Sequence, residues 1–287
     1  KLTYIYQGYP YGLAHAVYIT KDFIGDDAFV VYLGDNVLAE GIREYVKKFE
    51  ESDADAMVLL TEVPNPQRFG VAKFDENGRL IGLVEKPKEP PSNYALVGIY
   101  FFKPPYIFRA IETLRPSWRG ELEITDAIQK LIDWGLNVEY AIVKGWWKDT
   151  GTPKDILDAN RLLLDYKINN QVVKGKLDDN VRIEGRVYID EGVVVKSNTV
   201  IRGPVYIGKN SIIGPNAYIG PYTSIGQRSI LKGIEIENSV VMDDVVLDVE
   251  GMKIADSLIG SRTRITKSNA KPSGYRLILG ESTVIQL

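Results

Sequence analysis

Phe29-Val30-Val31-Tyr32-Leu33-Gly34-Asp35-Asn36 is the stretch that decides the fold of the first part of the chain. Its consecutive β-forming residues predict a strand buried on both faces, and the Gly-Asp-Asn that follows places a carboxylate at the strand's C-terminal end. In open α/β sheets, ligands bind at that end of the strands. Taken alone, Asp35-Asn36 is equally compatible with the start of an ordinary turn.

A second aspartate follows a strand-like run in the same way. Val138–Val143 leads into Lys144-Gly145-Trp146-Trp147-Lys148-Asp149-Thr150-Gly151, in which Asp149 lies in a glycine-rich turn ahead of a helix. Two carboxylates at separate strand ends suit Mg²⁺ when nucleotide phosphates supply most of the other ligands. We therefore expect Asp35 and Asp149 to hold Mg²⁺.

Strand and helix patterns alternate from Lys1 to about Asn170, which predicts a three-layer α/β domain over residues 1–170. The main expected elements are strands at Leu2–Tyr6, Phe29–Leu33, Ala56–Val63 and Tyr94–Phe102, a hairpin over 69–84, and an amphipathic helix around Tyr45 and Phe49. Thr152 and Pro153 predict the N-cap and first position of a further helix.

The period changes after that helix. Aliphatic residues recur every six positions, and we take them as the interior column of a β-helix over residues 171–287. These residues are Ile183, Ile189, Val195, Ile201, Ile207, Ile213, Ile219, Ile225 and Leu231. Past Leu231 the repeat blurs, and Gly280–Leu287 is expected to form a closing strand or cap.

Composition excludes several classes of protein. The 287 residues contain no cysteine, so disulfides and thiolate metal sites are impossible. A net charge of −3 with mixed signs gives no reason to expect nucleic-acid or membrane binding. There is no uninterrupted apolar run of about 18 residues and no signal-peptide pattern at Lys1, and we expect a cytoplasmic protein.

Five blocks of sequence carry a resemblance to a known family. They are Gln7-Gly-Tyr-Pro-Tyr-Gly-Leu-Ala-His-Ala-Val17, Leu33-Gly-Asp-Asn36, Val84-Glu-Lys-Pro87, Arg119-Gly-Glu-Leu-Glu-Ile-Thr-Asp126 and Trp147-Lys-Asp-Thr-Gly-Thr152. Together and in this order they resemble the sugar-1-phosphate nucleotidyltransferases, and most closely the long-form glucose-1-phosphate thymidylyltransferases. The resemblance implies a Rossmann-like catalytic domain followed by a left-handed β-helix of hexapeptide repeats.

The resemblance also implies a role for individual residues. Asp35 and Asp149 would bind Mg²⁺, and they would act in catalysis together with Lys86 and Arg119. Gln7, Gly12 and Asp35 would bind the nucleotide. The sugar-phosphate site would consist of Gly70, Glu85, Lys86, Gly98, Arg119 and Trp147.

The implied reaction joins glucose 1-phosphate to dTTP, giving dTDP-glucose and pyrophosphate. The attacking phosphate oxygen is already anionic near pH 7, so the reaction needs alignment and charge neutralisation but no general base. UTP or GTP remains an alternative nucleotide. The family's first strand, with its glycine-rich loop and catalytic arginine, does not match any part of this sequence, and a chain that began at Lys1 is expected to be inactive.

Two other classes of function remain open. Hexapeptide β-helices host acyltransferases that use a histidine base, although the one histidine, His15, lies on a predicted helix of the first domain. The chain could instead be a non-catalytic regulatory or assembly paralogue. In either case the flat faces of the β-helix, with Tyr206, Tyr218 and Tyr222 on or near them, lead us to expect a homo-oligomer.

Overall fold

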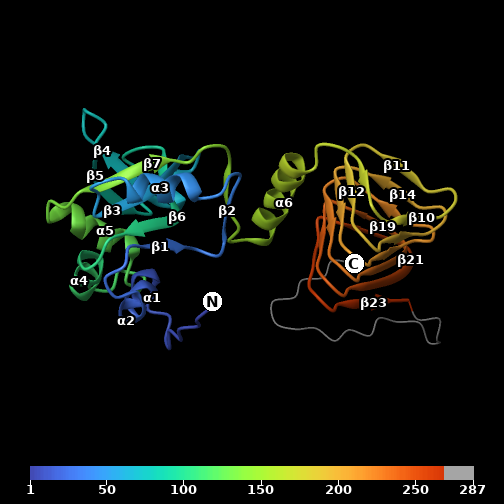
Figure 1. Ribbon diagram of the computed structural model, residues 1–287, viewed down its shortest axis with the longest axis horizontal. Helices are drawn as coiled ribbons and strands as arrows, with labels where there is room; N and C mark the ends of the chain where they lie inside the picture. Colours follow the sequence, from blue (N-terminus) through green and yellow to red (C-terminus); the bar gives the residue numbers. More distant parts are fainter. Residues whose placement is uncertain (268–287) are drawn as a thin grey trace. The chain divides into compact units, whose positions relative to one another are not determined.

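The computed structural model describes residues 1–267 and divides the chain into two compact units (Figure 1). The first unit spans Lys1–Gly151, and the second begins at Thr152. The closing strand expected at Gly280–Leu287 lies outside the described residues. No helix in the described part of the chain combines the length and apolar character needed to cross a membrane.

The first unit is built on one mixed sheet whose strands are joined in the order β5-β4-β6-β3-β7, with β1 also paired to β6. The strands are β1 (Phe29–Tyr32), β3 (Ala56–Glu62), β4 (Gly70–Phe74), β5 (Leu80–Glu85), β6 (Tyr94–Phe102) and β7 (Val138–Ile142). A separate antiparallel pair, β2 (Asn36–Leu38) and β8 (Trp147–Asp149), follows the ends of β1 and β7. The expected hairpin is present as β4 and β5.

Helices cover both faces of this sheet. They are α1 (Leu13–Tyr18), α2 (Lys21–Ile24), α3 (Arg43–Glu50), α4 (Tyr106–Glu112) and α5 (Ile124–Asp133), with a 3₁₀ turn, η1, at Pro66–Arg68. Alternate residues of β3 face opposite cores, as the period of a strand requires. Val58 packs in the core that contains α4 and α5, whereas Met57 packs with α3. The prediction of a three-layer α/β domain is confirmed.

Two details of the sequence prediction for this unit are wrong. Residues 1–7 form no regular secondary structure, and the side chains of Tyr4 and Tyr6 are 92% and 90% exposed. A strand needs a hydrogen-bonding neighbour, and within residues 1–267 none pairs with this segment. The second detail concerns β1, which is half-buried rather than fully buried. Val31 and Val30 pack against opposite cores, but β1 is an edge strand that pairs with β6 alone and therefore keeps part of its surface exposed.

The second unit is a parallel β-solenoid, the left-handed β-helix that the hexapeptide repeat predicts. One face stacks six strands in the order β22-β20-β18-β15-β12-β9. These are β9 (Val172–Val173), β12 (Val187–Ile189), β15 (Val205–Ile207), β18 (Thr223–Ile225), β20 (Val240–Val241) and β22 (Leu258–Ile259). The two remaining faces contain β10 (Lys176–Leu177), β11 (Arg182–Glu184), β13 (Val194–Val195), β14 (Val200–Arg202), β16 (Ile212–Ile213), β17 (Tyr218–Ile219), β19 (Ile230–Glu237), β21 (Val246–Ala255) and β23 (Arg264–Thr266).

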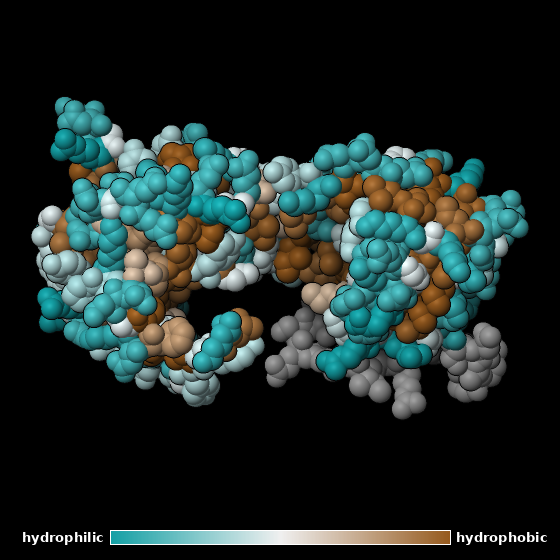
Figure 2. All heavy atoms as spheres, in the orientation of Figure 1, coloured by the Kyte–Doolittle hydropathy of each residue, from teal (hydrophilic) through white to brown (hydrophobic). Residues whose placement is uncertain are grey.

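The predicted aliphatic column fills the interior of the solenoid. Ile189, Ile207 and Ile225 occupy matching positions in successive coils, and each is fully buried. The repeat blurs past Leu231 because β19 and β21 shift register between Lys232 and Ile234. Figure 2 shows apolar side chains among the hydrophilic ones on the visible surface of this unit.

Helix α6 (Pro153–Lys167) belongs to the second unit, whereas the sequence analysis placed the boundary after it, at 170/171. Its side chains bind the solenoid: Asn160 donates to the carbonyl of Tyr222 at 2.9 Å, and Arg186 forms an ion pair with Asp165 at 2.5 Å. Thr152 caps the helix as expected, since its hydroxyl accepts from the Asp155 amide at 3.2 Å. The alternation of strand and helix patterns does not reveal which core a connecting helix joins.

Candidate active site

The structure brings the two aspartates expected to bind metal into neighbouring positions. β2 and β8 pair so that Asn36 lies opposite Asp149, which places Asp35 one residue from this pair. Both the amide and the hydroxyl of Thr150 donate to the carbonyl of Asp35 at 2.8 Å. The carboxylates thus come from two chain segments that are joined by a short ladder, rather than from flexible loops.

Asn36 is a junction that the sequence analysis did not include among the site residues. Its Oδ1 accepts from the indole of Trp147 at 2.7 Å and from the amide of Gly98 at 3.0 Å. Its Nδ2 donates to the carboxylate of Asp35 at 2.8 Å. One buried amide therefore binds both the carboxylate expected to hold metal and the tryptophan expected beside the sugar.

Gly98 makes room for this junction. A side-chain carbon at Gly98 would lie 2.6 Å from Nδ2 of Asn36 and 2.7 Å from Leu33. The space that a side chain at Gly98 would need is therefore already occupied by Asn36 and Leu33.

A second group of expected residues forms at the end of β5. Glu85 lies opposite Gly70 in the β4–β5 ladder, and its Oε2 accepts from the hydroxyl of Thr125 at 2.6 Å. A methyl group at Gly70 would lie 3.2 Å from both oxygens of that hydrogen bond. Gly70 thus leaves space for a carboxylate that is fixed from the side by the buried Thr125.

Arg119 lies within reach of three carboxylates. Its guanidinium is 2.8 Å from Glu121, 3.7 Å from Glu123 and 3.8 Å from Glu85. Burial lowers the pKa of Arg119, but the hydrogen bond to Glu121 and the three negative charges outweigh burial and raise the pKa above its ordinary value. A permanently charged, planar donor held in this way suits a phosphate group.

The carboxylates also affect neighbouring groups. Burial, together with the negative charges of Glu85 and Asp35, raises the pKa of the Tyr100 phenol, which therefore stays protonated at neutral pH. Burial and the charge of Glu123 raise the pKa of Asp126. Tyr100 is therefore close enough to feel the charge of one carboxylate from each group.

Phe69 connects the two groups. Its ring meets that of Trp147 edge-on at 5.4 Å between centroids, and its carbonyl accepts from the Lys86 amide at 3.0 Å. Lys86 itself is exposed and has a left-handed backbone, with φ of 42° just before Pro87. Such a conformation is uncommon for a residue with a side chain, and it turns Lys86 out of the end of β5.

The expected nucleotide-binding residues form a third group. Gln7 donates from Nε2 to the carbonyl of Gly12 at 3.3 Å and lies 3.2 Å from Nδ1 of His15. At Gly12, with φ of 105°, a side chain would clash with the backbone of Leu122 at 2.7 Å. The amide of Leu122 in turn donates to the carbonyl of Tyr11 at 2.7 Å. Since Leu122 lies three residues after Arg119, this backbone contact joins the segment expected to bind the nucleotide to the segment expected to bind phosphate.

The residues present fit a magnesium ion that is also bound by phosphates. Asp149 is the last residue of β8, and Asp35 directly precedes its partner strand β2, so two carboxylates lie at one end of the ladder. Mg²⁺ commonly takes one or two carboxylates with substrate phosphates and water. Among residues 1–267, no group of three or more His, Cys, Asp or Glu side chains gathers in a way that would hold a metal without a substrate.

The structure identifies further residues at this site that sequence reasoning missed. Thr125 and Glu123 both lie in the block Arg119–Asp126, so the resemblance pointed to their segment without giving them a role. Asn36 lies in the opening stretch itself. A polar side chain directly beside a proposed metal ligand was the available signal for Asn36.

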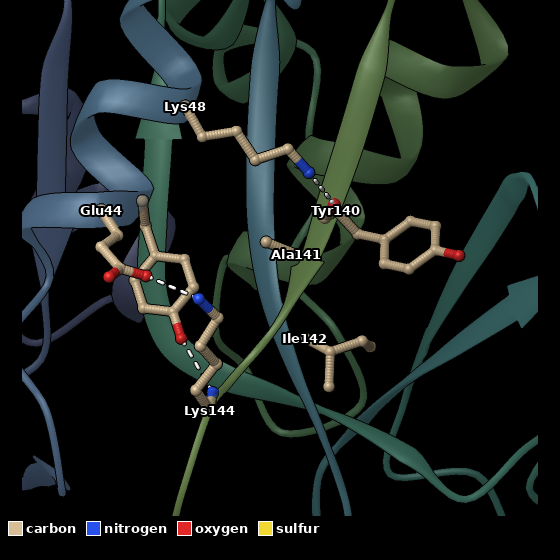
Figure 3. Close-up of a pocket in the computed structure, with 7 residues that line it drawn as sticks. Glu44, Lys48, Tyr140, Ala141, Ile142 and Lys144 are labelled. Atoms are coloured by element: carbon tan, nitrogen blue, oxygen red, sulfur yellow. Dashed lines mark hydrogen bonds and ion pairs between the residues drawn. The ribbon is translucent and has the colours of Figure 1, made fainter.

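A hollow of about 600 Å³ lies elsewhere in the first unit, between α3 and β7 (Figure 3). Lys144 bridges it by an ion pair to Glu44 at 2.8 Å, and its amide donates to the Tyr45 hydroxyl at 2.8 Å. None of the expected site residues lines this hollow.

Comparison with known proteins identifies the same two parts of the chain. Residues 1–166 match the family model described as nucleotidyl transferase, and residues 201–286 match the GMPPB C-terminal domain. A low-salt glycan biosynthesis nucleotidyltransferase, Agl11, of Haloferax volcanii is 50% identical over 100% of this chain and 80% of its own length. A glucose-1-phosphate thymidylyltransferase of Streptomyces antibioticus is 42% identical over 100% of this chain and 79% of its own length.

A solved structure shows the same fold. The crystal structure of a UDP-glucose pyrophosphorylase complexed with UDP-glucose aligns with a TM-score of 0.51 and 25% identity. The alignment covers 55% of this chain and 63% of that one. The chain thus spans about four fifths of these curated relatives, at 80% and 79%, and less than two thirds of the solved structure.

Proposed function

Since this chain belongs to the nucleotidyl transferase family, we propose that it condenses glucose 1-phosphate with dTTP to give dTDP-glucose and pyrophosphate. Sugar-1-phosphate nucleotidyl transfer is supported by both curated relatives and by the family match. The choice of glucose and thymine rests on the 42% identical thymidylyltransferase and on the motifs quoted above.

The observation that carries the proposal is the ladder between β2 and β8. It sets Asp149 opposite Asn36, the residue after Asp35, and the side chain of Asn36 binds both Asp35 and Trp147, whose ring meets that of Phe69. The residues that we propose for the metal and for the sugar phosphate are thereby linked through Trp147 and Phe69, which supports transfer of a nucleotidyl group to a sugar phosphate. A non-catalytic paralogue has no need to keep both carboxylates in one ladder.

The proposed chemistry uses position and charge. A sugar 1-phosphate oxygen attacks the α-phosphorus of the nucleotide, the bond from that phosphorus to the bridging oxygen breaks, and pyrophosphate leaves. Arg119 and Lys86 neutralise the sugar phosphate, while Glu85 accepts hydrogen bonds from sugar hydroxyls and is kept in place by Thr125. Asp35 and Asp149 would hold Mg²⁺, which would supply charge neutralisation at the nucleotide phosphates.

An alternative base or sugar has support of its own. The 50% identical relative is named for glycan biosynthesis rather than for thymidylyl transfer, and the solved structure carries UDP-glucose. The second candidate is therefore transfer from UTP, or from GTP, to a sugar 1-phosphate by the same residues.

The decisive experiment supplies glucose 1-phosphate and Mg²⁺ with each of dTTP, UTP, GTP, ATP and CTP to the full-length natural polypeptide and measures pyrophosphate release. We expect the fastest release with dTTP. Faster release with UTP or GTP would transfer the assignment to the second candidate. Absence of release with all five nucleotides, from a folded protein, would refute both for this sugar phosphate.

A further inference from the structure

We propose that Glu121 occupies the anion-binding side of Arg119 before substrate binds, and that the phosphate of the sugar phosphate displaces it. This inference rests on the proposed function, in which Arg119 neutralises that phosphate. It starts from the charges around the guanidinium, which lies near the carboxylates of Glu85, Glu121 and Glu123. One positive charge is thus outnumbered by three negative ones at the place where an anion is expected to bind.

The three carboxylates do not contact the same part of the guanidinium. Glu85 and Glu123 face Nη1 at 3.8 and 3.7 Å, which is too far for hydrogen bonds. Of the three, only Glu121 faces Nη2, which donates to its Oε2 at 2.8 Å. A phosphate bound to Nη2 would either take the place of this carboxylate or lie against it. Two anions in contact repel each other, so replacement is favoured.

Glu121 is also the carboxylate that is least firmly held. Its side chain is 35% exposed, compared with 22% for Glu85 and 8% for Glu123. Hydroxyl groups hold the other two, since Thr125 donates to Glu85 at 2.6 Å and Ser117 donates to Glu123 at 2.8 Å. Among residues 1–267, no second group donates to the carboxylate of Glu121. Water can therefore replace its one contact, whereas each of the others would lose a further hydrogen bond.

The displacement needs only a rotation of the Glu121 side chain. The carbonyl of Glu121 accepts from the Ser117 amide at 2.8 Å, and its Cβ lies 3.0 Å from the place of a side-chain carbon at Gly12. The loop that holds Arg119 is closed by the Gly120 amide, which donates to the Ser117 carbonyl at 2.9 Å. The backbone is thus fixed beneath both side chains, and the outer atoms of Glu121 can turn into solvent.

This arrangement makes Glu121 an internal competitor of the substrate. Part of the free energy of phosphate binding is used to break the contact between Glu121 and Nη2. Glu85 and Glu123 stay at Nη1 and keep the guanidinium aimed while Nη2 changes its partner. Loss of the Glu121 carboxylate should therefore strengthen, and not weaken, the binding of a sugar phosphate.

The test measures binding of glucose 1-phosphate to the full-length natural polypeptide by isothermal titration, without nucleotide. Glu121→Gln removes the charge at nearly constant size and should lower the Kd about fivefold, the gain expected when a partly exposed ion pair no longer has to be broken. Glu121→Asp keeps the charge but is one methylene shorter, which moves the carboxylate away from Nη2, and it should also lower the Kd. A residue with a merely structural role would raise the Kd when it is replaced.

Glu76→Gln is the matched control for net charge, because Glu76 is exposed at the turn between β4 and β5, at the other end of β5 from Glu85. It should leave the Kd unchanged. A Kd in Glu121→Gln that equals or exceeds that of wild type would overturn the inference. A wild-type Kd in Glu121→Asp would overturn it as well, because the charge and not the contact would then be responsible.

Inorganic phosphate, as a second probe, separates this inference from the proposed function. If wild type binds inorganic phosphate but not glucose 1-phosphate, and Glu121→Gln lowers the phosphate Kd, the choice of sugar phosphate fails and the role of Glu121 stands. If Glu121→Gln binds glucose 1-phosphate more tightly but wild type releases no pyrophosphate with any nucleotide, the reaction is refuted and the role of Glu121 again stands. If neither protein binds either probe, the inference is overturned.

Discussion

Replacing Asn36 with leucine should destabilise the first unit strongly, because it removes an acceptor from two donors without greatly changing the size of the side chain. The amide of Gly98 is buried and donates to Oδ1 of Asn36 at 3.0 Å. A buried donor without a partner costs about 1–3 kcal/mol. The indole of Trp147 is half-buried and can regain water, so its loss should cost about 1 kcal/mol or less. The expected decrease in the free energy of unfolding is therefore about 1–4 kcal/mol.

Tryptophan fluorescence offers an assay specific to this unit. The four tryptophans of the chain lie at positions 118, 134, 146 and 147, all before the second unit begins at Thr152. Guanidinium unfolding followed by fluorescence therefore reports on the unit that contains Asn36. Asn77→Leu, at the exposed hairpin turn, is the matched control and should change stability by less than about 0.5 kcal/mol.

Asn36→Asp separates packing from charge. An aspartate keeps an oxygen for both donors, so it should cost less stability than leucine does. It replaces the donor to Asp35 by a second negative charge, which should weaken catalysis more than folding. If Asn36→Leu lost less than about 1 kcal/mol, the two donors would have other acceptors, and the idea that Asn36 joins the metal and sugar sites would be refuted.

Three further predictions concern separate parts of the molecule. Asp149→Asn should lower pyrophosphate release by at least about 10²-fold without a comparable loss of stability, and unchanged release would refute its role in metal binding. Because burial raises the folded-state pKa of Asp126, its ionised form opposes folding above that pKa, and this penalty disappears as the pH falls below the unfolded value. Asp126→Asn should therefore unfold at a higher guanidinium concentration than wild type at pH 7, and the difference should shrink toward pH 3. In the solenoid, Ile201→Ala should lower the free energy of unfolding by about 2–5 kcal/mol, since Ile201 is fully buried. Val200→Ala, on the outer face of the same strand, should lower it far less. Unfolding followed by the circular dichroism of the β-strands would measure both.

The fold could be predicted largely from the sequence because both units depend on local periodicity. Every sixth position of the solenoid faces inward, so the burial of Ile189 and Ile207 can be predicted from the repeat alone. The position of α6 could not be predicted in this way. Its place in the second unit depends on contacts such as that between Asn160 and Tyr222, which are 62 residues apart.

The contacts of the candidate site were likewise predictable only where they follow from local sequence. The resemblance and the strand ends pointed to Asp35 and Asp149, and the ladder between β2 and β8 sets Asp149 opposite Asn36, the residue after Asp35. The role of Asn36 depends on partners 62 and 111 residues away, and no local pattern encodes those distances. Thr125 meets Glu85 across 40 residues for the same reason. Sequence reasoning therefore found the residues that carry charge more readily than those that position them.

The contacts that orient Gln7 are separate from those that orient Glu85, and this bears on how one fold can use several nucleotides and sugars. The segment proposed to bind the base is joined to the segment proposed to bind phosphate by backbone, through Tyr11 and Leu122, and not by the side chains that would read the base. The orientation of Gln7 depends on His15 and Gly12, whereas that of Glu85 depends on Thr125. Since no described side chain takes part in both sets of contacts, a substitution that changes the preferred base need not disturb the sugar site. We therefore expect base and sugar preference to vary independently within this fold, with the alignment of Asp35 and Asp149 left intact.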